Sequence, residues 1–115
     1  MPDFGSLLGL AARAGELVSG EDICMREIRS QRARLVVLAT DAGANGAKKI
    51  RDKCAFYGVP LVVALDRTVL GQVIGKGDRT VVAITSTAFA EMIKKVTGDA
   101  QAHAGGQGRS GGDGI

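Results

Sequence analysis

The sequence predicts an α/β fold in which one sheet lies between two layers of helices. Its 115 residues fit one ordinary domain. Short apolar runs, such as residues 34–40 and 60–65, alternate with segments whose apolar residues recur every three or four positions. Continuous apolar runs are typical of strands covered on both faces. Because strands alternate with helices, we expect a largely parallel sheet.

Each expected element follows from a local signal in the chain. Asp3, Asp66 and Ser86 are the expected N-caps of three helices, and Gly58 is the expected end of another. In chain order, the elements are a helix at 4–14, a strand at 16–18, a helix after Gly20, a strand at 34–40, a helix within 42–58, a strand at 60–65, a helix at 66–75, a strand at 80–85 and a helix at 86–96.

We expect a single domain at residues 1–97 followed by a tail at residues 98–115. The tail has seven glycines in its 18 residues and few apolar side chains, so it is predicted to be flexible. In the second expected helix, apolar spacing predicts that Ile23, Cys24 and Ile28 face inward, whereas Arg26 and Arg29 face water.

Charge is distributed unevenly along the chain. The formal net charge is +3, but the segment from Arg26 to Lys53 has eight basic residues against three acidic ones. Such a cluster is typical of a surface that binds a polyanion, although a solvated helix surface gives the same pattern. Only four residues are aromatic, so a surface with rows of stacking rings is not expected.

The sequence has few of the residues that catalysis or metal binding requires. It has one histidine, His103, and its two cysteines, Cys24 and Cys54, are far apart in the chain. These residues form no nucleophile–base constellation and no metal-ligand motif, so we expect no enzyme, no cofactor and no metal. Two isolated thiols are expected to be buried apolar residues in a reducing cytoplasm. No apolar run is long enough for a membrane span.

Two other motifs suggest phosphate chemistry only superficially. Asp41 follows a buried strand, as a phosphoacceptor does, but only Asp3 is near the chain start to complete an acidic cluster. We therefore interpret Asp41 as a residue that caps a helix or orders a loop. The segment at residues 75–80, "GKGDRT", lacks the spacing of a phosphate-binding loop and precedes a strand.

A better candidate site joins three loops, at residues 18–22, 40–49 and 75–80. In an alternating α/β chain all three can reach the same edge of the sheet. That edge would present backbone amides of Gly20 and Asn45, which suit phosphate oxygens, beside basic side chains. The basic residues are Arg26, Lys48, Lys49, Lys76 and Arg79. The alternative is that the glycines in these loops only turn the chain.

The order and spacing of "LLGLAARAGELVSGED", "IRSQRARLVVLATDAGANGAKKIRDKCAFYGVPLVV" and "LGQVIGKGDRTVVAIT" resemble one family over about residues 4–96. It is the ribosomal protein L-seven-Ae / L-thirty-e-like superfamily of kink-turn RNA binders, in particular its small bacterial YlxQ-type branch. The resemblance implies a three-layer α/β/α sandwich around a four-stranded mixed sheet that binds structured RNA without catalysis.

The resemblance also implies which residues contact RNA. In the family, the start of the second helix docks on a sharply bent RNA at tandem sheared G·A pairs. The matching positions here are Gly20, Glu21, Asp22, Ile23 and Arg26. Gly20 and Arg26 fit the family pattern, whereas Asp22 and Ile23 depart from it.

We therefore expect a cytoplasmic, monomeric RNA-binding protein that acts on ribosomes or in translation and recognises RNA shape. Expected partners are ribosomal or other non-coding RNA and, with it, ribosomal or translation proteins. The alternative is a protein-interaction adaptor on the same fold, with Asp22, Ile23 and residues 68–75 as its contact surface.

Overall fold

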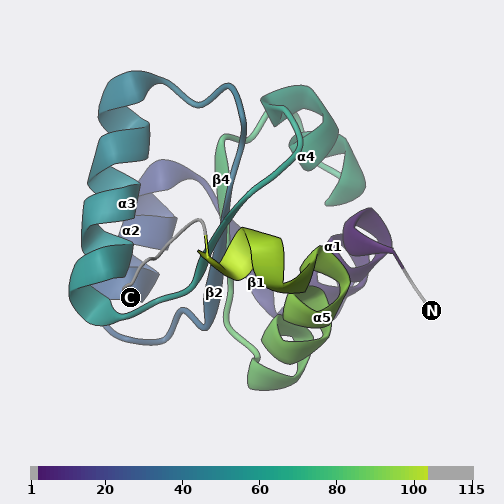
Figure 1. Ribbon diagram of the computed structural model, residues 1–115. Helices are drawn as coiled ribbons and strands as arrows, with labels where there is room; N and C mark the ends of the chain where they lie inside the picture. Colours follow the sequence, from purple (N-terminus) through teal and green to yellow (C-terminus); the bar gives the residue numbers. More distant parts are fainter. Residues whose placement is uncertain (1–2, 104–115) are drawn as a thin grey trace.

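The structure, a computed structural model, describes residues 3–103 (Figure 1). Helices and strands alternate along the chain, as the sequence predicts. In order, they are α1 (Phe4–Arg13), β1 (Leu17–Ser19), α2 (Glu21–Arg29), β2 (Leu35–Leu38), α3 (Ala44–Tyr57), β3 (Leu61–Val63), α4 (Arg67–Val73), β4 (Val81–Ile84) and α5 (Thr87–His103).

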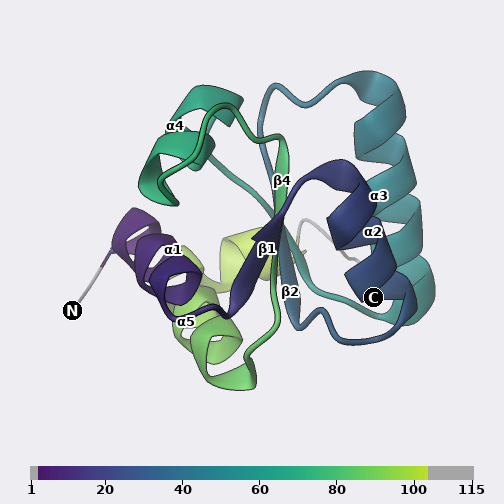
Figure 2. The same cartoon turned by 180° about the vertical axis from the view of Figure 1, so that it is seen from behind.

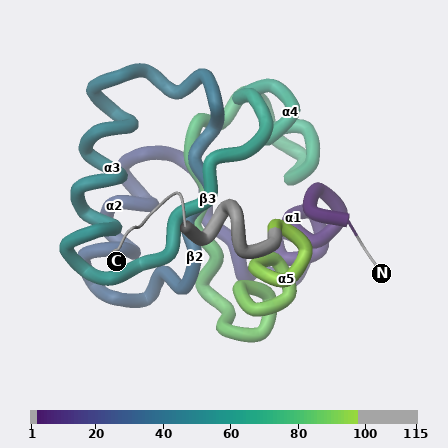
Figure 3. The backbone as a smooth tube through the Cα atoms, viewed as in Figure 1, coloured from purple at the N-terminus to yellow at the C-terminus, as the bar shows by residue number. Residues whose placement is uncertain are grey.

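The four strands form one mixed sheet in the order β1-β4-β2-β3. Only β2 and β3 run parallel, and they lie side by side in Figure 3. Strand β4 is antiparallel to both of its neighbours. The mixed sheet implied by the resemblance is therefore confirmed, and the largely parallel sheet predicted from element alternation is wrong. The reason is that α4 lies at the edge of the sheet where β3 ends and does not return the chain to the opposite edge. Strand β4 therefore starts where β3 ends and runs in the opposite direction.

Helices cover both faces of the sheet, which gives the expected three layers. Helices α2 and α3 lie on one face, and α1, α4 and α5 lie on the other (Figures 1 and 2). Alternate residues of each strand enter opposite cores. In β2, Val36 and Leu38 pack toward α2 and α3, whereas Leu35 and Val37 pack toward the other three helices.

The predicted helix boundaries that rest on local signals are confirmed. The side chains of Asp3, Asp66 and Ser86 accept hydrogen bonds from backbone amides in the first turns of α1, α4 and α5. Gly58 ends α3 in the left-handed conformation, with φ of 70°. Each of these signals acts within one helical turn, so distant parts of the chain have little effect on it.

Two other expectations meet a different outcome. Ile23 is 42% exposed, so its predicted inward position is wrong; the buried face of α2 consists of Cys24, Met25 and Ile28. Helix α5 continues to His103, past the helix end expected at residue 96, and the domain boundary at residue 97 stays a prediction. Residues 104–115 of the expected tail lie outside the described residues, and the flexibility of the tail stays a prediction.

Candidate functional site

One edge of the sheet brings the three candidate loops together. Strands β1, β2 and β3 end at this edge and β4 begins there, because Ser19 lies opposite Val82 and Leu38 lies beside both Val63 and Val81. Helices α2, α3 and α4, which follow those three strands, therefore all begin at the same edge. We call it the loop edge; in Figure 1 it includes the upper ends of α3 and α4.

The first and third loops are joined by Arg79. Its guanidinium Nε donates a hydrogen bond to the Ser19 hydroxyl at 3.1 Å, and the two residues lie 60 positions apart in the chain. The amide of Gly20 donates to the carbonyl of Val81 at 3.0 Å. The Gly20 amide is therefore already used within the sheet, and the prediction that it is exposed for phosphate is wrong. Gly20, with φ of 105°, instead lets the chain turn from β1 into α2.

The first and second loops meet through Glu21. Its carboxylate lies 3.9 Å from the ammonium of Lys49. A Cβ atom at Gly46 would lie only 2.7 Å from Oε1 of Glu21. The Glu21 carboxylate can therefore occupy this position only because residue 46 has no side chain. Glu21 thus links α2 to α3. Its negative charge also interacts favourably with the positive N-terminal end of the α2 dipole.

Helices α2 and α3 begin without a capping side chain. Gly20 and Gly43 are their N-caps, and neither start has a side-chain hydrogen bond to the first-turn amides. Asn45, which is exposed, lies in the first turn of α3. Amides in the first turn of a helix have no partner inside the helix and readily bind anionic oxygens.

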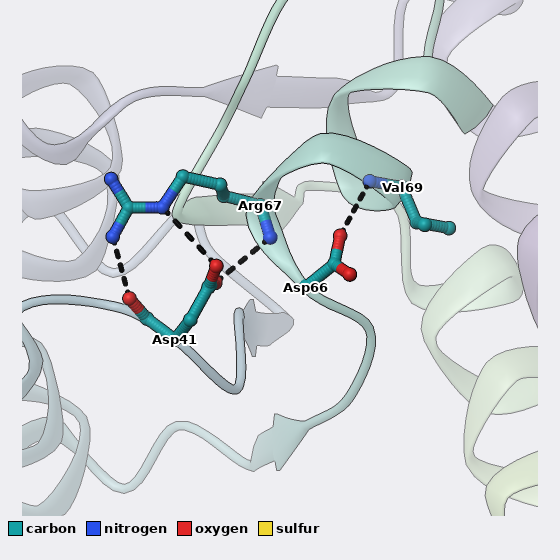
Figure 4. A network of polar contacts seen from close by, with 4 residues as sticks. All are labelled: Asp41, Asp66, Arg67 and Val69. Atoms are coloured by element: carbon teal, nitrogen blue, oxygen red, sulfur yellow. Dashed lines mark hydrogen bonds and ion pairs between the residues drawn. The ribbon is translucent and has the colours of Figure 1, made fainter.

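Helix α4 is different, because two carboxylates occupy its start (Figure 4). Asp66 accepts from the amide of Val69 at 2.9 Å. Asp41 accepts from the amide of Arg67 at 2.9 Å and from Nε of its side chain at 3.3 Å, and the Asp41 carbonyl accepts from Nη2 at 2.6 Å. The interpretation of Asp41 as a loop-ordering residue is confirmed.

The third loop is held against α4. The amide of Lys76 donates to the carbonyl of Gly71, and the amide of Arg79 donates to the carbonyl of Arg67. Gly71 lies so close to this loop that a Cβ atom there would overlap the carbonyl oxygen of Gly77. Lys76 is exposed, whereas Arg79 is half-buried and also bonds the carbonyl of Asp78.

A hollow of about 260 Å³ opens between these segments at the loop edge. Its wall includes Glu21 from the start of α2, Gly43 and Gly46 from the start of α3, Arg67 from α4 and Thr80 from the third loop. The hollow therefore lies where the predicted loops converge.

The predicted basic residues are not all at the loop edge. Lys49 lies close to Glu21 of another loop there, Arg79 donates a hydrogen bond to Ser19, and Lys76 is in the loop over α4. Lys48 faces solvent and pairs with Asp52 at 2.7 Å. This hydrogen bond raises the pKa of Lys48 from its ordinary value, so the side chain stays cationic. Arg26 is exposed on α2, on the same side of the helix as Ile23 and away from its start.

Sequence reasoning missed Arg67 and the hydroxyl of Ser19, both of which hold the loop edge together. Neither has a local signal. Arg67 follows the cap residue of α4, where any residue can stand, and Ser19 acts on a residue 60 positions away.

Helix α3 contains the net positive charge of the chain. It has four of the 15 basic residues and one of the 12 acidic residues, and the rest of the chain has eleven of each. The formal charge of +3 therefore resides on this helix, which starts at the loop edge.

The sequence signature of the Ribosomal protein L7Ae/L30e/S12e/Gadd45 family matches residues 3–94. The chain belongs to this family. Two curated relatives are named RNA-binding protein YlxQ. The relative from Bacillus subtilis (strain 168) is 53% identical over 87 residues, which cover 76% of this chain and 87% of the relative. The relative from Enterococcus faecium is 38% identical over 91 residues, which cover 79% and 87%.

A solved structure confirms the fold of this chain. A Bacillus halodurans protein of unknown function has a TM-score of 0.78 and 38% sequence identity, over 81% of this chain and 94% of that one. The recognition of the YlxQ-type branch from sequence is also confirmed by the two curated relatives.

The described residues contain no group of three or more His, Cys, Asp or Glu that could hold a metal ion. Among the helices of residues 3–103, none is both long enough and apolar enough to cross a membrane. Cys24 and Cys54 are buried and unpaired, as the sequence predicts.

Proposed function

We propose that this protein binds structured RNA at the loop edge, without catalysis, and that its target contains a sharply bent, kink-turn-like element. Membership of the family and the RNA-binding names of both curated relatives support the RNA-binding part. The proposed context is cytoplasmic, in a ribosome or in translation, with the protein acting as a monomer.

One observation carries the site assignment, namely that side-chain contacts join all three loops. Arg79 bonds Ser19, and Glu21 contacts both Gly46 and Lys49. An RNA backbone at this edge would meet the uncapped amides of α2 and α3 together with exposed lysines. Such contacts fix position and orientation on the RNA without reading its bases.

In this proposal the residues at the family-motif positions and the lysines near them have different roles. Gly20 shapes the turn, Glu21 positions Lys49, and Arg26 and Lys48 attract phosphates. Asp22 and Ile23 are both exposed beside Arg26. A carboxylate accepts hydrogen bonds from guanine amino or imino groups but donates none, so Asp22 suits the sheared guanines better than a phosphate. Asn45, Lys76 and Arg79 complete the proposed contact surface.

The test compares a kink-turn RNA with an RNA in which Watson–Crick pairs replace the G·A pairs, by calorimetry across a salt series. We expect tighter binding of the bent RNA. Arg26→Glu and Lys48→Glu should weaken binding and each reduce the salt slope by about one, whereas Lys95→Glu on α5 should change neither. Equal and negligible binding of both RNAs by the unmodified protein would remove the proposal.

Exposed apolar residues favour one second candidate, an adaptor that binds protein on the same fold. Ile23 is exposed, and a groove of about 690 Å³ between α1 and α4 includes Leu10 and Val69, both also exposed. Of the expected contact segment at residues 68–75, however, Leu70 and Ile74 are buried. A pull-down from RNase-treated lysate separates the candidates, because only an adaptor retains its partners when RNA is removed.

A further inference from the structure

Phe56, in the last turn of α3, is the most exposed large apolar residue among those that the structure describes. Its exposed fraction is 78%, against 42% for Ile23 and Met92. The other three aromatic residues of the chain are partly buried and pack against the two cores. Single exposed apolar residues are common, so exposure alone assigns no role.

The ring of Phe56 contacts the ring of its neighbour in the chain. It meets the ring of Tyr57 edge to face, with 4.8 Å between centroids and 80° between planes. Tyr57 in turn packs against the core beneath α2 and α3. In this geometry the edge of one ring meets the face of the other, so at least one face of Phe56 stays open.

Phe56 lies on the same side of α3 as the basic residues near the loop edge. Seven positions separate it from Lys49, which is two helical turns or about 10 Å along the axis. Lys48, Lys49 and Asp52 are exposed on this side, opposite the buried Ile50 and Cys54. An RNA strand that follows this side of α3 would therefore pass from the lysines to an exposed ring.

We propose that Phe56 is a stacking platform for one unpaired base of the bound RNA, next to the bent element. This inference rests on the proposed function and adds a second contact about two helical turns from Lys49. The occupant is an RNA base because the ring belongs to the helix that contains the net charge of the chain. A flat apolar face beside cations suits an anionic strand with exposed bases. With only one ring, the platform takes one base and tolerates any of the four.

The experiment measures binding of the kink-turn RNA with and without a short unpaired extension on either stem. The extension should increase affinity about tenfold for the unmodified protein, as expected for one base on one aromatic ring. Phe56→Ala and Phe56→Leu should remove this gain and leave affinity for the unextended RNA unchanged. Phe56→Leu is the matched control for apolarity, because it keeps an apolar side chain but cannot stack.

A second measurement uses fluorescence, since the chain has no tryptophan. In Phe56→Trp, the extended RNA should quench the emission of the indole and the unextended RNA should not. Met92→Trp is the control: Met92 is exposed on α5, on the other side of the sheet, and the emission of this variant should not respond to the extension.

The two hypotheses fail differently. If no RNA binds the unmodified protein, the proposed function fails. If the kink-turn RNA binds but the extension adds nothing, or if Phe56→Leu keeps the full gain, the stacking platform alone is wrong. Equal quenching of the Phe56→Trp variant by both RNAs would also overturn it.

Discussion

Asp41 connects two segments of the loop edge with a single carboxylate. One oxygen accepts from the amide of Arg67 and the other from its guanidinium. We expect Asp41→Ala to reduce the free energy of unfolding by about 1 kcal/mol, because the Arg67 amide loses its acceptor. For a domain of this size the melting temperature should fall by about 4–8 °C, measured by calorimetry.

Asp41→Asn separates the hydrogen bond from the charge. The amide oxygen can still accept from the Arg67 amide, and an ion pair between two half-exposed groups contributes little. The loss should therefore be clearly smaller than for Asp41→Ala. Equal losses would mean that charge, and not the backbone hydrogen bond, stabilises the start of α4.

The two thiols are expected to be inert in the folded protein. Burial raises the pKa of Cys24 and of Cys54 to about 12 each. The Cys24 thiol also lies 3.7 Å from the carbonyls of Val18 and Val81. At pH 8 iodoacetamide should modify neither cysteine until denaturant unfolds the chain, as measured by mass spectrometry, since the thiolate is the reactive form.

The same shift fixes the sign of a pH dependence. A raised pKa means that the folded state holds its thiol protons more tightly than the unfolded state does. Stability from this source is complete below the ordinary thiol pKa near 9 and decreases as pH rises toward 12. A urea midpoint that rises between pH 8 and pH 10 would contradict this assignment.

At the scale of elements, α4 and the loop after it depend on the absence of a side chain at Gly71. A Cβ atom there would overlap the backbone oxygen of Gly77, and backbone cannot rotate away as a side chain can. We expect Gly71→Ala to lower stability by about 2 kcal/mol, even though alanine favours helix. Chemical denaturation measures the loss.

Gly77→Ala is the matched control for Gly71→Ala. A Cβ atom at Gly77 would have no heavy atom within 4 Å, and its backbone does not need positive φ. Its stability should therefore stay within about 0.5 kcal/mol of the unmodified protein. If the two variants lose the same stability, the close contact between α4 and the loop is not what Gly71 provides.

Elements with local signals could be predicted from sequence, and their pairing could not. The side chains of Asp3, Asp66 and Ser86 each accept a hydrogen bond from the amide three residues later. The local sequence is therefore enough to predict where these helices begin. The direction of β4 depends instead on where α4 comes to rest. No local pattern encodes that position; only the resemblance to a family indicated a mixed sheet.

The candidate site shows the same limit. The three loops could be predicted to share an edge, because the order of strands and helices implies it. The hydrogen bond from Arg79 to Ser19 could not be predicted, because it joins residues 60 positions apart. The hydrogen bond from the Gly20 amide to the Val81 carbonyl could not be predicted either. Ile23 was predicted on the wrong side of α2. In a helix this short, an apolar residue at the border of the buried face has nearly the same sequence spacing as a residue within that face.

For the molecule as a whole, the question is whether RNA responds to net charge or to charge in one place. A net charge of +3 on a chain of this size gives only a weak general attraction, and the chain outside α3 is neutral. If the proposed function is right, the attraction must come from α3 and the loop edge. Two pairs of adjacent lysines on opposite faces of the sheet allow a direct comparison.

Lys48→Glu/Lys49→Glu on α3 and Lys94→Glu/Lys95→Glu on α5 change the net charge equally. The α3 variant breaks the ion pair of Lys48 with Asp52 and the longer contact of Lys49 with Glu21, and the α5 variant breaks the ion pair of Lys94 with Glu91. We expect the α3 variant to lose RNA affinity and about two units of salt slope, and the α5 variant to keep both, measured by calorimetry over a salt series. Since steering by net charge would weaken both variants alike, equal losses would contradict a localised site. A loss confined to α3 would mean that RNA is attracted by the helix that contains the uncompensated charge and that begins at the loop edge.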